Sequence, residues 1–308
     1  MSFINTPLGI VLRWLAGIFG GNFAWAVFIF TLLINLVMLP LTIRSQKATA
    51  DQARLKPKLE AIKRRCGDDK NKFAQEQQAL YQKEKVSMAG GCLPLIIRLI
   101  IMWAVYDVIT SPLLYILSID KGTIETALNA AVNSGLIKNA AARGSQIELF
   151  NLIQNGTVTA KGITPDMLSS VSFDFLGINL TQTPTFSFNI FGGGFQTIWV
   201  IPILSFLTAI ASSVISMILN KRTNPDAPSM ATMMLMMPVI SLVIAFTVPG
   251  AVGFYWAASN LIACAIQSAV QIVYNPNRII AKSQITDVVK KYKLEQKTIA
   301  EKKASHLN

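Results

Sequence analysis

Long apolar stretches separated by polar and basic segments dominate the pattern of this chain. A helix that crosses a bilayer needs about 20 consecutive, mostly apolar residues. Five stretches reach that length: 24–43, 92–117, 197–219, 230–248 and 251–274. Pro249 and Gly250 separate the last two, which predicts a tight helical hairpin between them. The pattern therefore predicts an all-α membrane protein with five transmembrane helices.

Two further segments show helical character outside these five stretches. Between Thr6 and Phe19, apolar side chains recur every three or four residues with the single charge of Arg13, which predicts a helix lying in the membrane interface. Residues 45–86 are typical of a polar helical hairpin that turns near Gly67. We expect no cleaved signal peptide, because no small-residue cleavage site follows the first apolar stretch.

Basic residues are distributed unevenly among the connecting segments. Segment 44–91 carries 12 Lys and Arg residues, the loop 220–229 carries two and the tail after residue 274 carries eight. Segment 118–195 carries only four, against five acidic residues. Because loops rich in Lys and Arg stay on the cytoplasmic side, we expect the N-terminus to lie outside the cell and the C-terminus in the cytoplasm.

These assignments divide the chain into ten consecutive parts. In chain order they are an outer interfacial helix, the first span, a cytoplasmic helical hairpin, the second span, an extracytoplasmic loop, the third span, a cytoplasmic loop, the fourth and fifth spans and a basic cytoplasmic tail. Their bounds are 1–22, 23–44, 45–90, 91–117, 118–195, 196–219, 220–229, 230–248, 251–274 and 275–308. The extracytoplasmic loop contains two predicted helices, near 123–141 and 145–154.

Composition narrows the classes of function. The chain is 52% hydrophobic and 14% charged, whereas a soluble domain carries about 25% charged residues. The net charge is +12, the one histidine is His306, and the three cysteines lack a CxxC spacing. Zinc sites, His-based triads and disulfide frameworks therefore lack their residues. We expect no enzyme, no catalytic residues, no metal and no cofactor.

Polar residues inside apolar stretches are costly in lipid and therefore informative. Arg98 is the most informative of them, because an arginine at mid-helix costs about 2.5–3.5 kcal/mol on insertion scales, and no acidic residue lies at a matching depth. Asp107, in contrast, lies near enough to the outer interface to reach water. We expect a polar groove that opens to the cytoplasm and is lined by Asn35, Arg98, Ser212, Ser213, Ser216, Gln267 and Gln271. Separate snorkelling or helix–helix hydrogen bonds are the alternative, above all for the serines.

Four segments carry sequence motifs in a fixed order. They are LLINLVMLPLTIRSQK, the 45–90 hairpin running into GCLPL, FDFLGINLTQTP, and MMLMMPVISLVIAFTVPGAVGFYWAASNLIACAIQ. This ordered series resembles the YidC/Oxa/Alb membrane protein insertases. The resemblance implies a multi-pass protein of the bacterial plasma membrane that inserts nascent membrane proteins and helps them to fold, without covalent chemistry. One departure concerns the groove cation, which the family usually carries at the position of Asn35, with a glutamine at the position of Arg98.

The resemblance also implies how substrate and partners are handled. The groove takes up the hydrophilic flank of a client, while the client's apolar segment slides along the third and fifth spans, where we place Trp199, Phe206, Tyr255 and Trp256. The implied partners are nascent membrane proteins, membrane lipids and the ribosome, which the basic tail and hairpin would contact, with the Sec translocon as a further candidate. A hydrated hairpin and tail without a ribosome contact is the alternative.

Two other classes of function remain open from the sequence. A small-solute or ion transporter would use Arg98 as a substrate site, but transporters typically show internal repeats and broken helices at the midplane, and we find neither pattern in the sequence. A structural subunit of a translocation complex would not need Arg98 to be exposed.

Overall fold

The computed structural model describes residues 2–87, 93–184, 196–223 and 231–273, together with scattered residues between 278 and 299. The helices are α1 (Ser2–Ile18), α2 (Phe23–Val37), α3 (Leu39–Arg54), α4 (Lys56–Cys66), α5 (Lys70–Lys83), α6 (Leu93–Thr110), α7 (Pro112–Tyr115), α8 (Lys121–Asn133), α9 (Ser145–Gln154), α10 (Pro165–Ser169), α11 (Val200–Thr223), α12 (Ala231–Ala245) and α13 (Gly250–Val273), and a 3-10 turn covers Thr197–Trp199. Strands β1 (Asp174–Phe175) and β2 (Ile178–Asn179) form one antiparallel hairpin. The mostly helical fold class is confirmed.

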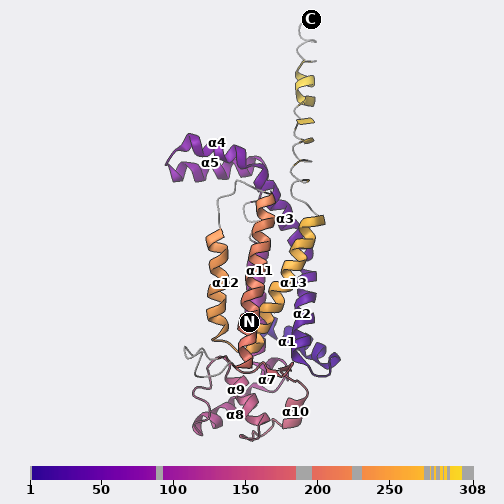
Figure 1. Ribbon diagram of the computed structural model, residues 1–308, viewed down its shortest axis with the longest axis vertical. Helices are drawn as coiled ribbons and strands as arrows, with labels where there is room; N and C mark the ends of the chain where they lie inside the picture. Colours follow the sequence, from indigo (N-terminus) through magenta and orange to yellow (C-terminus); the bar gives the residue numbers. More distant parts are fainter. Residues whose placement is uncertain are drawn as a thin grey trace. The chain divides into compact units, whose positions relative to one another are not determined.

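The chain divides into two compact units. Unit 1 comprises Met1–Val37, Ile96–Ile218 and Pro228–Ile266, and unit 2 comprises Met38–Leu95, Leu219–Ala227 and Gln267–Asn308. Within unit 1, the short helices α7, α8, α9 and α10 gather at one end of the long apolar helices (Figure 1).

Length and apolarity qualify two helices of the described residues as candidate membrane spans. They are Thr197–Ile218 and Gly250–Val273, and α2 with α3 adds a third if this bent pair forms one span. Part of α12, Met236–Ala245, is a shorter apolar helix. The structure therefore supports a membrane protein with two or three spans by this measure, and the count of five stays a prediction.

Two of the predicted stretches are divided by a break in the helix. Stretch 24–43 separates into α2 and α3 at Met38, two residues before Pro40. Stretch 92–117 separates into α6 and α7 at Ser111, immediately before Pro112. Proline lacks a backbone N–H and disfavours helical geometry in the residue before it. These prolines therefore divide helices that hydropathy alone joins.

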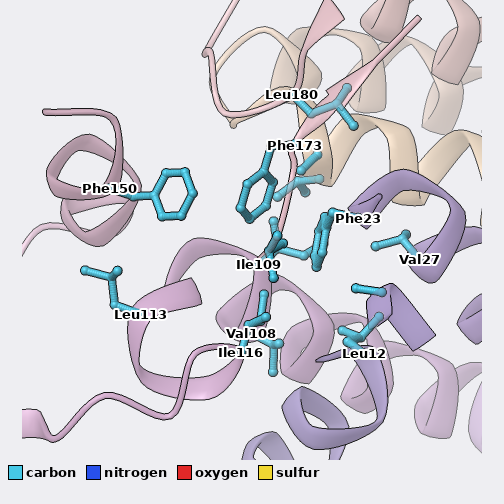
Figure 2. Close-up of a cluster of buried hydrophobic side chains, with 14 of the residues drawn as sticks. Leu12, Phe23, Val27, Val108, Ile109, Leu113, Ile116, Phe150, Phe173 and Leu180 are labelled. Carbon is cyan, nitrogen blue, oxygen red and sulfur yellow. The ribbon is translucent and has the colours of Figure 1, made fainter. Parts of the chain in front are cut away.

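The core of unit 1 forms where the short helices meet the start of α2 and the end of α6 (Figure 2). Phe173 lies between two other aromatic rings, with its ring centroid 4.6 Å from that of Phe23 on α2 and 5.3 Å from that of Phe150 on α9. The surrounding buried side chains come from α1, α2, α6, α7 and the segment after the β-hairpin: Leu12, Val27, Val108, Ile109, Leu113, Ile116 and Leu180. Phe173 thus joins elements that are far apart in the sequence.

The segment around the β-hairpin also supplies backbone acceptors to two helix N-termini. The Phe23 N–H at the start of α2 donates to the Ser172 carbonyl at 2.9 Å. At the start of α13, the N–H of Gly250 donates to the Gln182 carbonyl and that of Ala251 to the Leu180 carbonyl, both at 2.8 Å. The first amides of a helix have no acceptor within the helix. Segment 172–182 therefore satisfies amides at the starts of both α2 and α13.

Gly250 permits the close approach that these bonds require. A Cβ atom at this position would lie 2.6 Å from Ile198 Cδ1 and 3.3 Å from the Leu180 carbonyl oxygen. A side chain here would therefore push apart α13, the 3-10 turn before α11 and the segment after the β-hairpin.

The β-hairpin turns through Leu176 and Gly177, both with positive φ, at 51° and 79°. Two-residue hairpin turns with positive φ at both positions favour Asn-Gly, because a branched L-residue is strained there. Leu176 is nevertheless present, and it is 87% exposed. Its side chain therefore gains little from burial in the fold while its backbone adopts a costly conformation.

In unit 2, α4 and α5 form a helical hairpin with charged pairs between its parts. Asp69 caps α5 by accepting the Lys72 N–H at 3.0 Å. Glu84 accepts a hydrogen bond from Lys58 Nζ, and its Oε2 lies 3.7 Å from Arg54 Nη2. The hydrogen bond from Lys58 is the main cause that lowers the pKa of Glu84 below its usual 4.5, and the charges of Lys58 and Arg54 add to it.

We predict that Phe173→Ala lowers the free energy of unfolding by about 3–5 kcal/mol, because it leaves a cavity between α2 and α9. Chemical denaturation of the full chain in detergent measures the change. Leu176→Ala, which truncates an exposed apolar side chain three residues later, is the matched control and should change stability by less than about 0.5 kcal/mol. Equal losses in both variants would contradict the central role of Phe173.

We predict that Leu176→Asn raises the stability of the chain by about 1 kcal/mol, because asparagine tolerates the left-handed backbone conformation better than leucine. The midpoint of thermal unfolding of the full chain measures the effect. Leu176→Val should lower that midpoint, since a β-branched residue is more strained at positive φ. A lower midpoint for the asparagine variant would show that Leu176 makes a stabilising contact.

A third prediction concerns the pH dependence of the α4–α5 hairpin. Because the folded pKa of Glu84 is lowered, its ion pairs stabilise the hairpin fully above about pH 4.5 and lose this contribution as the pH falls through the lower folded value. Glu84→Gln should therefore speed amide hydrogen exchange in α5 at neutral pH, with the difference from the unmodified chain vanishing in acid. Glu60→Gln, at an exposed 3.9 Å pair with Lys56, is the control and should show little effect. A pH-independent effect of Glu84→Gln would contradict the assignment.

Candidate functional site

Arg98 on α6 is held by neutral oxygens of α13. Its Nη2 donates to the carbonyl oxygen of Ser259 and to Ser259 Oγ, both at 3.1 Å. Ser259 is only 8% exposed, and its side chain also hydrogen-bonds Tyr255, one helical turn earlier. No carboxylate among the described residues lies within ion-pair distance of Arg98. The guanidinium is therefore oriented by α13, while no carboxylate in the described part of the chain neutralises its charge.

Asn35 makes its hydrogen bond within its own helix. Its Nδ2 donates to the Thr31 carbonyl at 2.8 Å, and Thr31 Oγ1 in turn donates to the Val27 carbonyl at 2.6 Å. Such bonds to a carbonyl four residues earlier are a common way for short polar side chains to satisfy themselves in a helix. The described contacts therefore do not bring Asn35 and Arg98 together.

The remaining predicted groove residues fall into both units. Ser212, Ser213 and Ser216 are half-buried on α11 in unit 1. Gln267 is half-buried and Gln271 is buried, and both belong to unit 2 although they lie on α13. The structure thus assigns the predicted groove residues to their helices, and a groove formed by all seven stays a prediction.

The four residues predicted to guide apolar segments differ in exposure. Trp199 and Tyr255 are buried, whereas Phe206 and Trp256 are half-buried. Trp199 packs edge-on against Phe246, with ring centroids 6.1 Å apart. Trp199 and Tyr255 therefore belong to the packed interior of unit 1 rather than to an open surface.

An apolar cavity of about 210 Å³ lies between α2, α11, α13 and β1. Its aromatic wall includes Phe175, whose ring centroid is 6.1 Å from that of Trp25 and 5.0 Å from that of Phe254. The other lining residues are Phe28, Leu204, Thr208, Ala257, Ala258 and Leu261. None of the four guiding residues named from the sequence lines this cavity. The cavity forms because Phe175 of β1 packs beside α2, α11 and α13, a contact that hydropathy does not reveal.

Ser259 is the residue of this site that sequence reasoning missed. A serine in an apolar helix is usually satisfied by its own backbone, so its side chain alone gives little signal. The available signal was the unpaired Arg98, which requires an acceptor on a neighbouring helix in the absence of an acid at its depth. Among the described residues, no group of three or more His, Cys, Asp or Glu side chains is placed to hold a metal ion.

Comparison with known proteins identifies the family. The sequence model of the family described as "60Kd inner membrane protein" matches residues 14–277. One curated relative, the membrane protein insertase YidC of Paracoccus denitrificans, is 41% identical over 107 residues. This alignment covers 35% of the present chain and 17% of that relative. Because the family match covers most of the chain, the protein belongs to the 60Kd inner membrane protein family, the family of the YidC/Oxa insertases.

Proposed function

We propose that this protein is an insertase that moves nascent membrane proteins into the bilayer and helps them to fold, without covalent chemistry. The observation that carries the proposal is the unneutralised guanidinium of Arg98, held between α6 and α13 by Ser259. Family membership and the apolar helices support the same function. The proposed site lies in the bacterial plasma membrane, where five spans enclose a groove open to the cytoplasm.

The hydrogen bonds between Arg98 and Ser259 are of a kind that an acidic residue of a client can replace. Two bonds to neutral oxygens are weaker than a paired, charge-assisted contact with a carboxylate. An acidic residue on the polar flank of a client therefore competes favourably with Ser259 for the guanidinium. Arginine also stays protonated when it is partly dehydrated, so the charge persists inside the bilayer.

A groove of this kind lowers the barrier to moving polar residues across the membrane. Polar backbone and side chains are tolerated at membrane depth only where protein or water satisfies them. We propose that Asn35, Arg98, the three serines of α11 and the two glutamines of α13 shorten the hydrocarbon path in this way. The membrane potential adds work of about 2.3 kcal/mol per elementary charge per 100 mV on charged residues of the client.

The apolar cavity between α2, α11 and α13 supports a path for the apolar segment of the client. Leu204 and Leu261 line it, and both are exposed side chains on helices that qualify as membrane spans. Together with Phe206 and Trp256, these residues offer an apolar surface from which a client helix passes into lipid. We propose nascent chains as the clients, with the ribosome approaching the basic hairpin and tail from the cytoplasm and the Sec translocon as a further partner.

The test is insertion by the purified chain in liposomes. Short single-span clients with matched acidic or neutral translocated tails are added, and protease protection measures insertion. We predict that Arg98→Gln lowers insertion of the acidic client about tenfold and that of the neutral client less, since a hydrogen bond to a charged group contributes about 1.5–3 kcal/mol. Asn35→Ala should have a mild effect, and Arg13→Gln on α1 controls for loss of one positive charge. The exchange Asn35→Arg with Arg98→Gln should restore insertion.

Each result decides a separate point. Full activity of Arg98→Gln with both clients would refute the role of Arg98 as the groove cation. Loss of activity that the exchange does not rescue would assign Arg98 a structural contact with Ser259. Failure of the unmodified chain to insert any client, together with solute flux into the vesicles, would refute the insertase function in favour of a transporter.

A further inference from the structure

A polar cavity of about 240 Å³ lies in unit 1 where α6 meets the short helices. Asp107 near the end of α6, Arg143 in the segment before α9, and Lys121 and Glu125 on α8 contribute its charged side chains. It is separate from the Arg98 site, and the proposed insertion mechanism does not use it. Its lining residues come from the end of α6, from α7 and α8, and from the segment that leads into α9.

Lys121 and Glu125 form an ion pair, whereas Asp107 and Arg143 do not pair with each other. Lys121 Nζ lies 3.3 Å from Glu125 Oε1, one turn apart on α8. Asp107 and Arg143, in contrast, make no ion pair with each other or with any described residue of opposite charge, although both line the same cavity. An acid and a base that share a cavity without contact are complementary to a ligand that carries both charges apart from each other.

The structure holds the two unpaired charges in fixed places. The guanidinium carbon of Arg143 lies 5.2 Å from the ring centroid of Trp103 and 5.6 Å from that of Tyr106, both on α6. Stacking on two rings orients the cation while leaving its five N–H donors for an anion. Asp107 Oδ2 accepts a hydrogen bond of 3.3 Å from Nδ2 of Asn5, a residue of α1 that is only 1% exposed. Asn5 Oδ1 is buried and accepts no hydrogen bond from the described residues. This oxygen, next to Asp107, therefore needs a donor from outside the described part of the chain.

The surroundings favour a lipid as the source of this ligand. Trp103 is a half-exposed indole on the apolar helix α6, and Tyr106 follows it one turn later toward the helix end. Trp and Tyr are enriched at the level of the lipid headgroups. We therefore expect this end of α6 to lie at the level of the lipid headgroups, and Arg143, which lines the cavity, stacks on both of its aromatic rings.

We propose that this cavity binds the headgroup of a phospholipid that carries a phosphate and a primary ammonium, as in phosphatidylethanolamine. Arg143 binds the phosphate, and Asp107 accepts hydrogen bonds from the ammonium, which also supplies a donor near Asn5. A trimethylated ammonium cannot donate to Asp107, and a glycerol headgroup carries no positive charge. The site therefore selects phosphatidylethanolamine over phosphatidylcholine and phosphatidylglycerol.

The experiment compares short-chain lipids of identical acyl length on the full chain in detergent, with the shift of the unfolding midpoint at increasing lipid concentration as the readout. We expect phosphatidylethanolamine to bind about tenfold more tightly than the other two lipids. Asp107→Asn should remove this preference without weakening phosphatidylglycerol, because the amide oxygen can still accept from Asn5. Arg143→Gln should weaken both phosphatidylethanolamine and phosphatidylglycerol about tenfold, and Arg143→Lys should retain most of the binding if the glutamine variant folds poorly.

Matched controls lie on the same part of unit 1. Lys161→Gln and Glu148→Gln remove exposed charges outside the cavity and should leave all three affinities unchanged. Equal affinities for the three lipids in the unmodified chain, or an unchanged preference in Asp107→Asn, would overturn the proposal. Competition by free phosphoethanolamine at the same concentration as the lipid would assign the cavity to a soluble zwitterion and overturn the lipid site.

Discussion

The first amides of an α-helix need acceptors from outside the helix, and this requirement organises unit 1. The segment from Ser172 to Gln182 offers carbonyl oxygens to Phe23 at the start of α2 and to Gly250 and Ala251 at the start of α13. An unsatisfied amide buried in an apolar setting costs about 1–3 kcal/mol. The β-hairpin therefore fixes where two apolar helices begin. It also places Phe173 in the core and Phe175 in the wall of the apolar cavity.

The charged side chains also depend on partners from other elements, and the kind of partner differs between the polar hairpin and the apolar helices. In the hairpin of unit 2, the half-buried carboxylate of Glu84 is paired with the opposite charges of Lys58 and Arg54. Within the apolar helices, Arg98 donates to the two oxygens of Ser259 and makes no ion pair with any residue that the structure describes. Neutral partners keep a charged group in place and leave most of its electrostatic interaction for another molecule.

Hydropathy predicted the helical fold class because an apolar run of 20 residues has few alternatives in lipid. It did not predict the breaks at Met38 and Ser111, since these depend on the backbone N–H that Pro40 and Pro112 lack and, at Ser111, on the restriction of the residue before a proline. The sequence indicated Arg98 through its cost in lipid, yet Ser259 depends on how α6 and α13 meet. The cavity around Asp107 and Arg143 was hidden for the same reason, because these two residues are 36 positions apart in the sequence and line one cavity only in the folded chain.

The hydrogen bond between the start of α2 and segment 172–182 has a consequence for the order in which the chain folds during synthesis. The acceptor for Phe23 is the carbonyl of Ser172, which the ribosome adds about 150 residues later. At synthesis rates of about 5–20 residues per second, this partner follows roughly 7 to 30 seconds after α2 has emerged. During that interval the Phe23 amide at the start of α2 lacks the acceptor that it has in the folded chain. A protein of the insertase family thus completes the start of α2 only after more than half of this chain has been translated.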